Sequence, residues 1–128
     1  MGVFGQPETS KTSSGKLCFE VCGHPKFAEK LDLLRKSNNR QDKRLVQLID
    51  DGIQILSEKP TAGDKVSPDR WPKDYLELGL PCLFKYDLTK YDYRMTYCIK
   101  DYPDKKGVFV WIIEYMTHNE YNRRFGYD

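Results

Sequence analysis

Four residues in the later part of the chain are of the types that handle phosphate. They are Lys85, Arg94, His118 and Tyr121. Arginine offers a planar fork to two phosphate oxygens, and lysine offers a compact positive charge. Histidine can donate or accept a proton near neutral pH, and tyrosine can donate a hydrogen bond or stack on a base. If the fold brings the four together, they form a pocket suited to phosphate chemistry.

Strand alternation predicts that these residues share one face of a sheet. Three stretches have β character: 82–89, 93–100 and 108–116. Lys85 and Arg94 fall opposite the apolar side chains of their stretches, which belong under helices, so both are expected on the open face. The third stretch leads to His118 and Tyr121 beside them. Alternation alone also fits a simpler interpretation, because the solvent face of a sheet normally carries Lys and Arg.

Two amphipathic helices precede these strands. The first begins after His24 and carries Phe27, Leu31 and Leu34 at the spacing of one helical face. The second helix, with Asp42 as its expected cap, has the strongest helical period in the chain. Its periodic positions are Leu45, Leu48, Ile49, Gly52, Ile53 and Leu56. A short polar turn joins the two helices, which predicts an antiparallel hairpin.

The remaining segments complete an α+β domain. Residues 16–22 predict a strand before the hairpin, and residues 61–81 predict a loop pinned to the body by Trp71 and Tyr75. A short helix is expected from about Asn119 to the C-terminus. The predicted order is therefore β-αα-βββ followed by a helix, with the hairpin on one face of a small, mostly antiparallel sheet.

Composition limits the class of protein. The chain has 128 residues and a net charge of +2, so one domain is expected and no global basic field indicates a nucleic-acid partner. Residues 1–15 are rich in Gly, Ser and Thr and predict a disordered tail before a single domain at 16–128. The four cysteines lack zinc-ligand spacing, and neither a signal peptide nor a membrane-length apolar run is visible. We expect a cytoplasmic protein with reduced thiols and no metal or membrane partner.

Three motifs in the chain are similar to those of one known family. They are LSEKPTAGDKV after the second helix, LFKYDLTKYDYRMTY with its Tyr-Arg-x-x-Tyr ending, and IIEYMTHNEYNRRFGYD with His-x-x-Tyr before Arg-Phe-Gly-Tyr. In order and spacing they resemble the RelE/ParE toxin superfamily of type II toxin–antitoxin systems, in particular its RelE-like branch. The resemblance covers residues 16–128 and agrees with the predicted order of elements.

The resemblance implies a small toxin that cuts mRNA in the ribosomal A site and is neutralised by a cognate antitoxin. Such enzymes work without metal or cofactor: the ribose 2′-OH attacks the adjacent phosphorus and leaves a 2′,3′-cyclic phosphate. By position, Arg94 matches the arginine that stabilises the phosphate, and Lys85 matches a basic residue on the preceding strand. His118 and Tyr121 match positions assigned to acid–base work or base stacking. Further RNA contacts are expected from Lys90, Arg123 and Arg124.

The chain departs from the family pattern at two positions. Asp87 stands where many members have a second basic residue, and Asn119 stands where many have an arginine after the histidine. Asp87 is a candidate general base, or alternatively a solvated strand residue paired with Lys85 or Lys90. Two other functions stay open beside the ribonuclease: a RelE-fold binding protein that has lost catalysis, and a ParE-like gyrase inhibitor.

Overall fold

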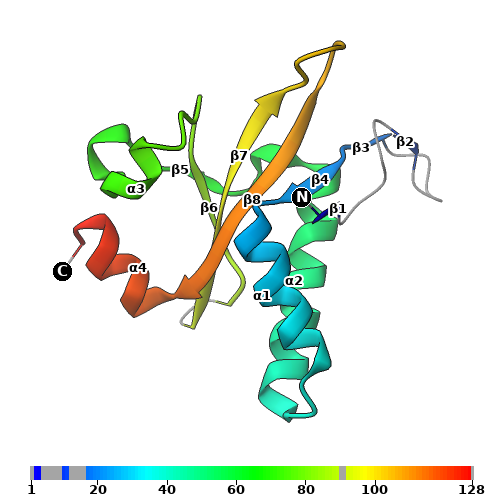
Figure 1. Ribbon diagram of the computed structural model, residues 1–128, viewed down its shortest axis with the longest axis vertical. Helices are drawn as coiled ribbons and strands as arrows, with labels where there is room; N and C mark the ends of the chain where they lie inside the picture. Colours follow the sequence, from blue (N-terminus) through cyan, green and yellow to red (C-terminus); the bar gives the residue numbers. More distant parts are fainter. Residues whose placement is uncertain (1, 4–9, 12–16, 90–91, 128) are drawn as a thin grey trace.

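The computed structural model describes residues 2–3, 10–11, 17–89 and 92–127. The strands are β1 Gly2–Val3, β2 Ser10–Lys11, β3 Leu17–Cys18, β4 Val21–Gly23, β5 Asp64–Lys65, β6 Phe84–Asp87, β7 Tyr93–Asp101 and β8 Val108–Thr117. The α-helices are α1 Pro25–Lys36, α2 Arg40–Glu58, α3 Lys73–Leu76 and α4 His118–Phe125, and the 3-10 turns are η1 Pro60–Ala62 and η2 Pro68–Arg70. Helices α1 and α2 lie on one side of a twisted sheet, and α3 and α4 lie on the other (Figure 1).

The sheet is mixed but mostly antiparallel, as predicted. Its strand order is β1-β4-β8-β7-β6-β5, and β2 and β3 form a separate small ladder. Among the described ladders, β4 and β8 form the parallel pair and the others are antiparallel. The long β7–β8 hairpin turns at Gly107, whose φ of 106° lies in a region that favours glycine. These elements confirm an α+β domain.

Local capping sets the start of each hairpin helix. His24 caps α1, because its Nδ1 accepts a hydrogen bond from the backbone N–H of Lys26 at 3.1 Å. The prediction that Asp42 caps α2 is wrong. The Oδ1 of Asn39 accepts from the N–H of Gln41 at 2.7 Å and of Asp42 at 3.4 Å, so Asn39 is the cap. Asp42 lies in the first turn instead, where its negative charge interacts favourably with the positive end of the helix dipole.

The helical hairpin packs tightly on the sheet at a glycine. A Cβ at Gly52 would come within 3.1 Å of Leu88 and Met95 side chains, so the absent side chain lets α2 approach the strands. Around this contact lies the hairpin-side core, whose buried members are Val21, Phe27, Leu31, Leu45, Ile49, Ile53, Leu56, Leu88, Met95, Tyr97, Val110, Ile112 and Tyr115. The helical periods and the alternation of residues 82–100 predicted the members of this core from α1, α2, β7 and Leu88, but no face was predicted for Val110, Ile112 and Tyr115.

The opposite face of the sheet is covered as well, and the prediction of an open face there is wrong. A second core lies on it, formed by Val66, Tyr75, Leu83, Cys98, Ile113, Met116, Tyr121 and Phe125. The loop after α2 and helix α4 supply its outer layer. Tyr75, 1% exposed, anchors the loop through its hydroxyl to Thr96 Oγ1 at 2.7 Å, and Trp71 Nε1 donates to the Val66 carbonyl at 3.0 Å. Trp71 and Tyr75 therefore pin the loop as expected.

The predicted first strand is divided into two. Between β3 and β4, the N–H of Phe19 donates to the carbonyl of Ser57 at 2.6 Å at the end of α2, so this part of the chain leaves the ladder. Gly2–Val3 pairs with β4, and Ser10–Lys11 pairs with β3. The other residues of 1–15 lie outside the described part of the chain, so the expectation of a tail stays a prediction.

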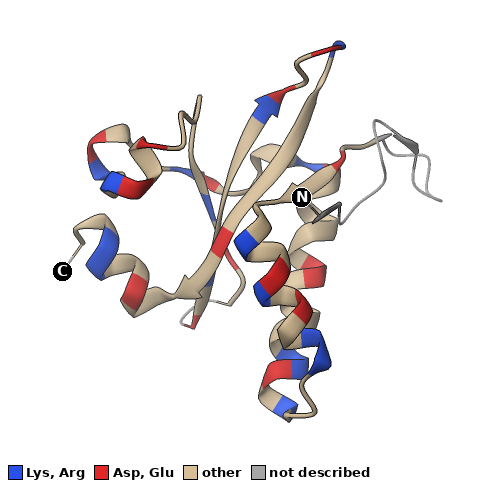
Figure 2. Ribbon diagram, viewed as in Figure 1, with Lys and Arg blue, Asp and Glu red and all other residues tan. Residues whose placement is uncertain are grey.

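Charges of both signs are interspersed over the fold. Figure 2 shows Lys and Arg interspersed with Asp and Glu along the ribbon of the α1–α2 hairpin. Within the described residues, no helix has the length and apolar character needed to cross a membrane. All four cysteines are free, with Cys18, Cys22 and Cys98 buried.

Candidate functional site

The residues predicted to handle phosphate converge on one carboxylate. Asp87 Oδ1 lies 2.8 Å from Arg94 Nε, 3.7 Å from Lys85 Nζ and 3.9 Å from His118 Nε2. The Arg94 guanidinium in turn lies 4.7 Å from the centre of the Tyr121 ring. We call these five residues the charged cluster. The fold thus brings together the four predicted catalytic residues and the candidate base.

Register and capping explain this convergence. Asp87 and Arg94 are direct partners in the β6–β7 ladder, so their side chains lie on the same face of the sheet. Helix α4 begins directly after β8, with the Thr117 hydroxyl oxygen accepting from the N–H of Glu120 at 3.1 Å. The N–H of His118 donates to the Asp92 carbonyl at 3.0 Å, which ties the start of α4 to the end of the β6–β7 connection.

The cluster contains the polar atoms that the fold leaves without a hydrogen bond. Among the described residues, the buried side-chain atoms with no hydrogen-bond partner are Arg94 Nε, His118 Nε2 and Tyr121 Oη. Arg94 Nε is close to Asp87 in charge contact, but its N–H does not meet hydrogen-bond geometry there. A buried polar atom without a partner costs free energy, and such atoms often mark a functional site. Arg94 Nε and His118 Nε2 lie 2.8 and 3.9 Å from Asp87 Oδ1, so an anion that displaces this carboxylate would meet both nitrogens.

Tyr121 orients Arg94 and cannot stack on a base. Its side chain is 1% exposed. The Arg94 guanidinium lies against the Tyr121 ring, and the Phe125 ring stacks on the same ring with 4.2 Å between the two ring centres. Burial raises the pKa of the Tyr121 phenol, with a smaller contribution from Tyr127, so the hydroxyl stays protonated at neutral pH. Of the two roles that the resemblance implied, base stacking does not fit this buried ring, and acid–base work stays a prediction.

The cluster's positive charge is largely balanced. Lys85 Nζ contacts Asp64 at 3.3 Å in addition to Asp87, and Lys85 and Arg94 are both mostly buried. Asp87 is 41% exposed, so it can exchange partners with an incoming ligand. Of the two pairings expected for Asp87, the one with Lys85 is present; Lys90 lies outside the described residues. Asp64 was missed by sequence reasoning, because only the β5–β6 pairing places it opposite Lys85.

Arg124 does not contribute a free phosphate contact, contrary to the prediction. Its Nη1 donates to both carboxylate oxygens of Glu114 at 2.9 Å, and its Nη2 lies 2.7 Å from Asp74. Burial alone would lower the pKa of this guanidinium, but the charge and hydrogen bond of Glu114 outweigh burial and raise it. The Tyr75 hydroxyl also donates to Glu114. Arg124 therefore ties α4 to α3 and β8.

Arg123 and Lys90 are the other residues predicted to contact RNA. Arg123 is exposed on α4 and forms no ion pair within the described part of the chain. Asn119 is exposed at the start of the same helix. Lys90, predicted to contact RNA, lies outside the residues that the structure describes. Arg123 thus remains a candidate phosphate contact on the outer face of α4.

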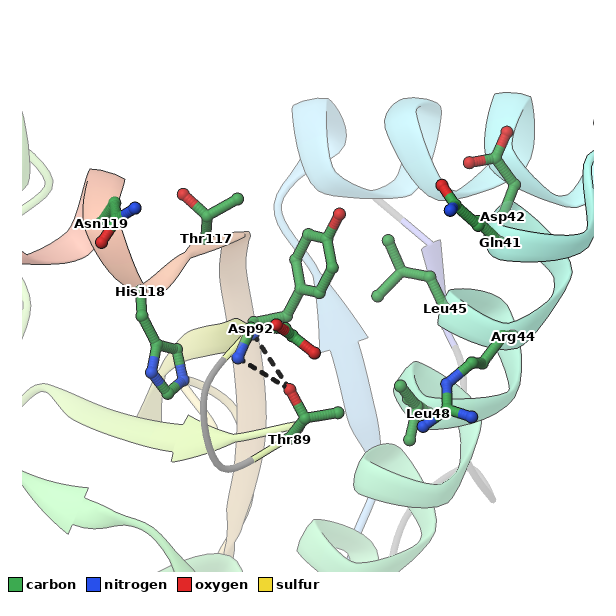
Figure 3. Close-up of a pocket in the computed structure, with 11 residues that line it drawn as sticks. Gln41, Asp42, Arg44, Leu45, Leu48, Thr89, Asp92, Thr117, His118 and Asn119 are labelled. Carbon is green, nitrogen blue, oxygen red and sulfur yellow. Dashed lines mark hydrogen bonds between the residues drawn. The ribbon is translucent and has the colours of Figure 1, made fainter.

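A cleft of about 510 Å³ opens next to the charged cluster. His118 and Asn119 line it from α4, and Gln41, Arg44 and Leu48 line it from α2 (Figure 3). His118 belongs to both the cleft and the cluster. Sequence reasoning missed the cleft, because it forms only when the N-terminal half of α2 packs near the end of the sheet.

Comparison with models of protein families, with curated proteins and with solved structures found no match for this chain. The described residues include no group of three or more His, Cys, Asp or Glu side chains placed to hold a metal ion. The geometry of the cluster is therefore the basis for any functional proposal.

Proposed function

We propose that the protein is a RelE-like toxin that cleaves RNA, acting on mRNA in the ribosome. The observation that supports this best is the charged cluster itself. Two cationic side chains, a histidine and a carboxylate meet at one point. Within the described residues, Arg94 Nε, His118 Nε2 and the adjacent Tyr121 Oη lack hydrogen bonds. A bound phosphodiester that displaces Asp87 would offer oxygens to the two nitrogen atoms. The proposed toxin would be neutralised by a cognate antitoxin.

Each member of the cluster has a distinct task in the proposed reaction. Arg94 and Lys85 bind the non-bridging oxygens of the phosphate and stabilise the negative charge that grows on them. Asp87, displaced from these cations by the phosphate, accepts the proton of the ribose 2′-OH. Tyr121 is a positioning residue, because its ring lies against the guanidinium of Arg94.

The chemical step is an internal transfer at phosphorus. The 2′-oxygen forms a bond to phosphorus as Asp87 takes its proton, and the bond to the 5′-oxygen of the next nucleotide breaks. His118, in its protonated form, gives a proton to that departing oxygen. The products are a 2′,3′-cyclic phosphate and a 5′-hydroxyl, so neither water nor an external acid enters this step.

The order of elements adds support to the proposal. Within the described residues, β4, the α1–α2 hairpin, strands β6, β7 and β8 and helix α4 follow in the order that the RelE-like resemblance implies. The two-residue strand β5 and the short helix α3 lie between the hairpin and β6 in addition. The Tyr-Arg-x-x-Tyr motif falls on β7 and the His-x-x-Tyr motif falls on α4. Both motifs therefore deliver their residues to the charged cluster.

A primer-extension assay on mRNA programmed in ribosomes tests the proposal. The wild-type protein should produce new 5′ ends in the A-site codon, and Arg94→Ala should lose them. Arg40→Ala is a matched control, because Arg40 is exposed at the start of α2, outside the cluster and the cleft. Cleavage that survives in folded Arg94→Ala would contradict the proposal.

A binding protein without catalysis is the second candidate. The observation that favours it is the ion pairing of Asp87 with Arg94 and Lys85, which reduces the charge available to a phosphate. Folded wild-type protein that binds RNA or ribosomes but yields no cleaved ends would select this candidate.

A further inference from the structure

The cleft beside the charged cluster has the size and lining of a small-molecule site. Its volume of about 510 Å³ lies within the range of about 300–1,000 Å³ that is usual for such pockets. Leu45 and Leu48 supply an apolar wall on α2, and Tyr93 adds aromatic surface. The volume is small and the lining concave, whereas a stable protein partner buries about 1,200 Å² or more over a broad surface.

Two amide side chains and two carboxylates, Asp42 and Asp92, also line the cleft, and Asp42 already accepts a hydrogen bond from the Ser37 hydroxyl at 2.6 Å. Gln41 on α2 and Asn119 on α4 are exposed side chains with no hydrogen bond inside the described structure, and each offers an amide oxygen. Asp92 is also exposed, and its hydrogen bonds within the described residues are made by its backbone: its N–H donates to Thr89 Oγ1 at 3.0 Å, and its carbonyl accepts from the N–H of His118 at 3.0 Å. These groups suit a flat ligand with amino groups on its edge.

Basic side chains lie on both sides of these polar groups. On one side is His118, which shares the charged cluster with Arg94; on the other is Arg44, which is exposed and forms no ion pair in the described part (Figure 3). In an RNA chain, each flat base is attached to a sugar that lies between two phosphates.

We propose that the cleft binds a nucleobase of the RNA, one next to the phosphate held by Arg94 and Lys85. The inference rests on the proposed function and adds a base-binding subsite to it. The base lies against the Tyr93 and Leu48 wall, and its edge meets Gln41 and Asp92. Because the carboxylate of Asp92 only accepts hydrogen bonds, bases with an amino group bind better than uracil, which has none.

Binding of short probes to the full chain tests the subsite. The probes are 2′-deoxy dinucleotides, which have no 2′-OH to attack, and an abasic dinucleotide with the same phosphates. Dinucleotides of adenine or cytosine should bind about fivefold or more tightly than the abasic probe, as base stacking usually provides. The affinity of uracil dinucleotides should lie between these two. In NMR titrations, the base-dependent shifts should map to α2 near Arg44 and to the start of α4.

Two variants separate base from phosphate binding. Gln41→Ala should reduce the advantage of base-bearing probes over the abasic probe about threefold or more, as expected for loss of a hydrogen bond. Asp92→Asn should reduce the difference in affinity between adenine and uracil dinucleotides. Gln54→Ala is the matched control, because Gln54 is exposed on the same helix outside the cleft. All three positions are on the surface, so the fold should be retained.

The inference is overturned if the abasic probe binds as tightly as the dinucleotides, if neither variant changes the ratio, or if no base-bearing probe binds. The same proteins are assayed for cleavage of ribosome-bound mRNA. Arg94-dependent cleavage without base preference would overturn the subsite alone. Base-dependent shifts in the cleft with no Arg94-dependent cleavage would overturn the proposed ribonuclease instead.

Discussion

Asp87 competes with a phosphate for the same two cations, and Asp87→Asn removes that competition without changing the size of the side chain. Arg94 Nε and Lys85 Nζ lie 2.8 and 3.7 Å from its Oδ1. Because Asp87 is 41% exposed, each ion pair contributes about 0.2–1 kcal/mol, or about 0.5–2 kcal/mol for both. A phosphate that displaces the carboxylate loses this energy. The variant should therefore bind RNA about 2- to 30-fold more tightly.

Catalysis by the same variant should change in the opposite direction. Asparagine cannot take the proton of the 2′-OH, and loss of a general base usually slows a reaction by about 10²- to 10⁴-fold. Fluorescence anisotropy with a 2′-deoxy oligonucleotide measures binding, and single-turnover cleavage measures the chemical step. Asp101→Asn on the neighbouring strand β7 is the control for the change in net charge, because Asp101 lies at the end of β7 that is far from Arg94. Unchanged or weaker binding by Asp87→Asn would refute the competition, and unchanged cleavage would refute the base.

Three further substitutions test the framework around the site. A Cβ at Gly63 would lie 2.3 Å from the Lys85 carbonyl oxygen, so Gly63→Ala should destabilise the fold by about 1–3 kcal/mol, and an unchanged urea midpoint would contradict the close contact. Burial raises the pKa of Tyr97 to about 12. The protonated hydroxyl contributes its full stability below pH 10, the pKa of tyrosine in the unfolded chain, and this contribution is lost as the pH rises towards 12. In urea unfolding between pH 8 and 11, the free energy of unfolding should therefore fall less steeply with pH for Tyr97→Phe than for the wild-type protein. Arg124→Ala should lower the free energy of unfolding by about 1–3 kcal/mol, because Glu114 loses a hydrogen-bond partner. The RNA cleavage per folded molecule should stay unchanged. A variant of unchanged stability that no longer cleaves would show that Arg124 contacts the RNA.

Alternation along the strands was sufficient to predict the face shared by Lys85 and Arg94, because side chains on a strand repeat every second residue. The position of His118 followed from the end of the last strand. The sequence could not show that the opposite face carries a second core, because its outer layer comes from a loop without a clear period. It also could not show Asp64 beside Lys85, since that contact depends on a two-residue strand far away in the chain.

The start of α2 also shows which features can be predicted from local sequence and which need the structure. The hydrophobic period of α2 identified the helix, but Asn39 and Asp42 are both good cap residues, and only the observed hydrogen bonds distinguish them. Arg124 illustrates the limit for function: its position in a basic motif suggested RNA, whereas its neighbours Glu114 and Asp74 are far apart in sequence and make it part of the framework.

The chemistry of the cut ends is the most direct test of the central claim, that the charged cluster cleaves RNA by attack of the 2′-OH. Mass spectrometry of fragments from ribosome-bound mRNA identifies those ends. The wild-type protein should give 2′,3′-cyclic phosphates and 5′-hydroxyls, and Arg94→Ala should give neither. Fragments with 3′-hydroxyl and 5′-phosphate ends, or cyclic phosphates that persist in Arg94→Ala, would contradict the account.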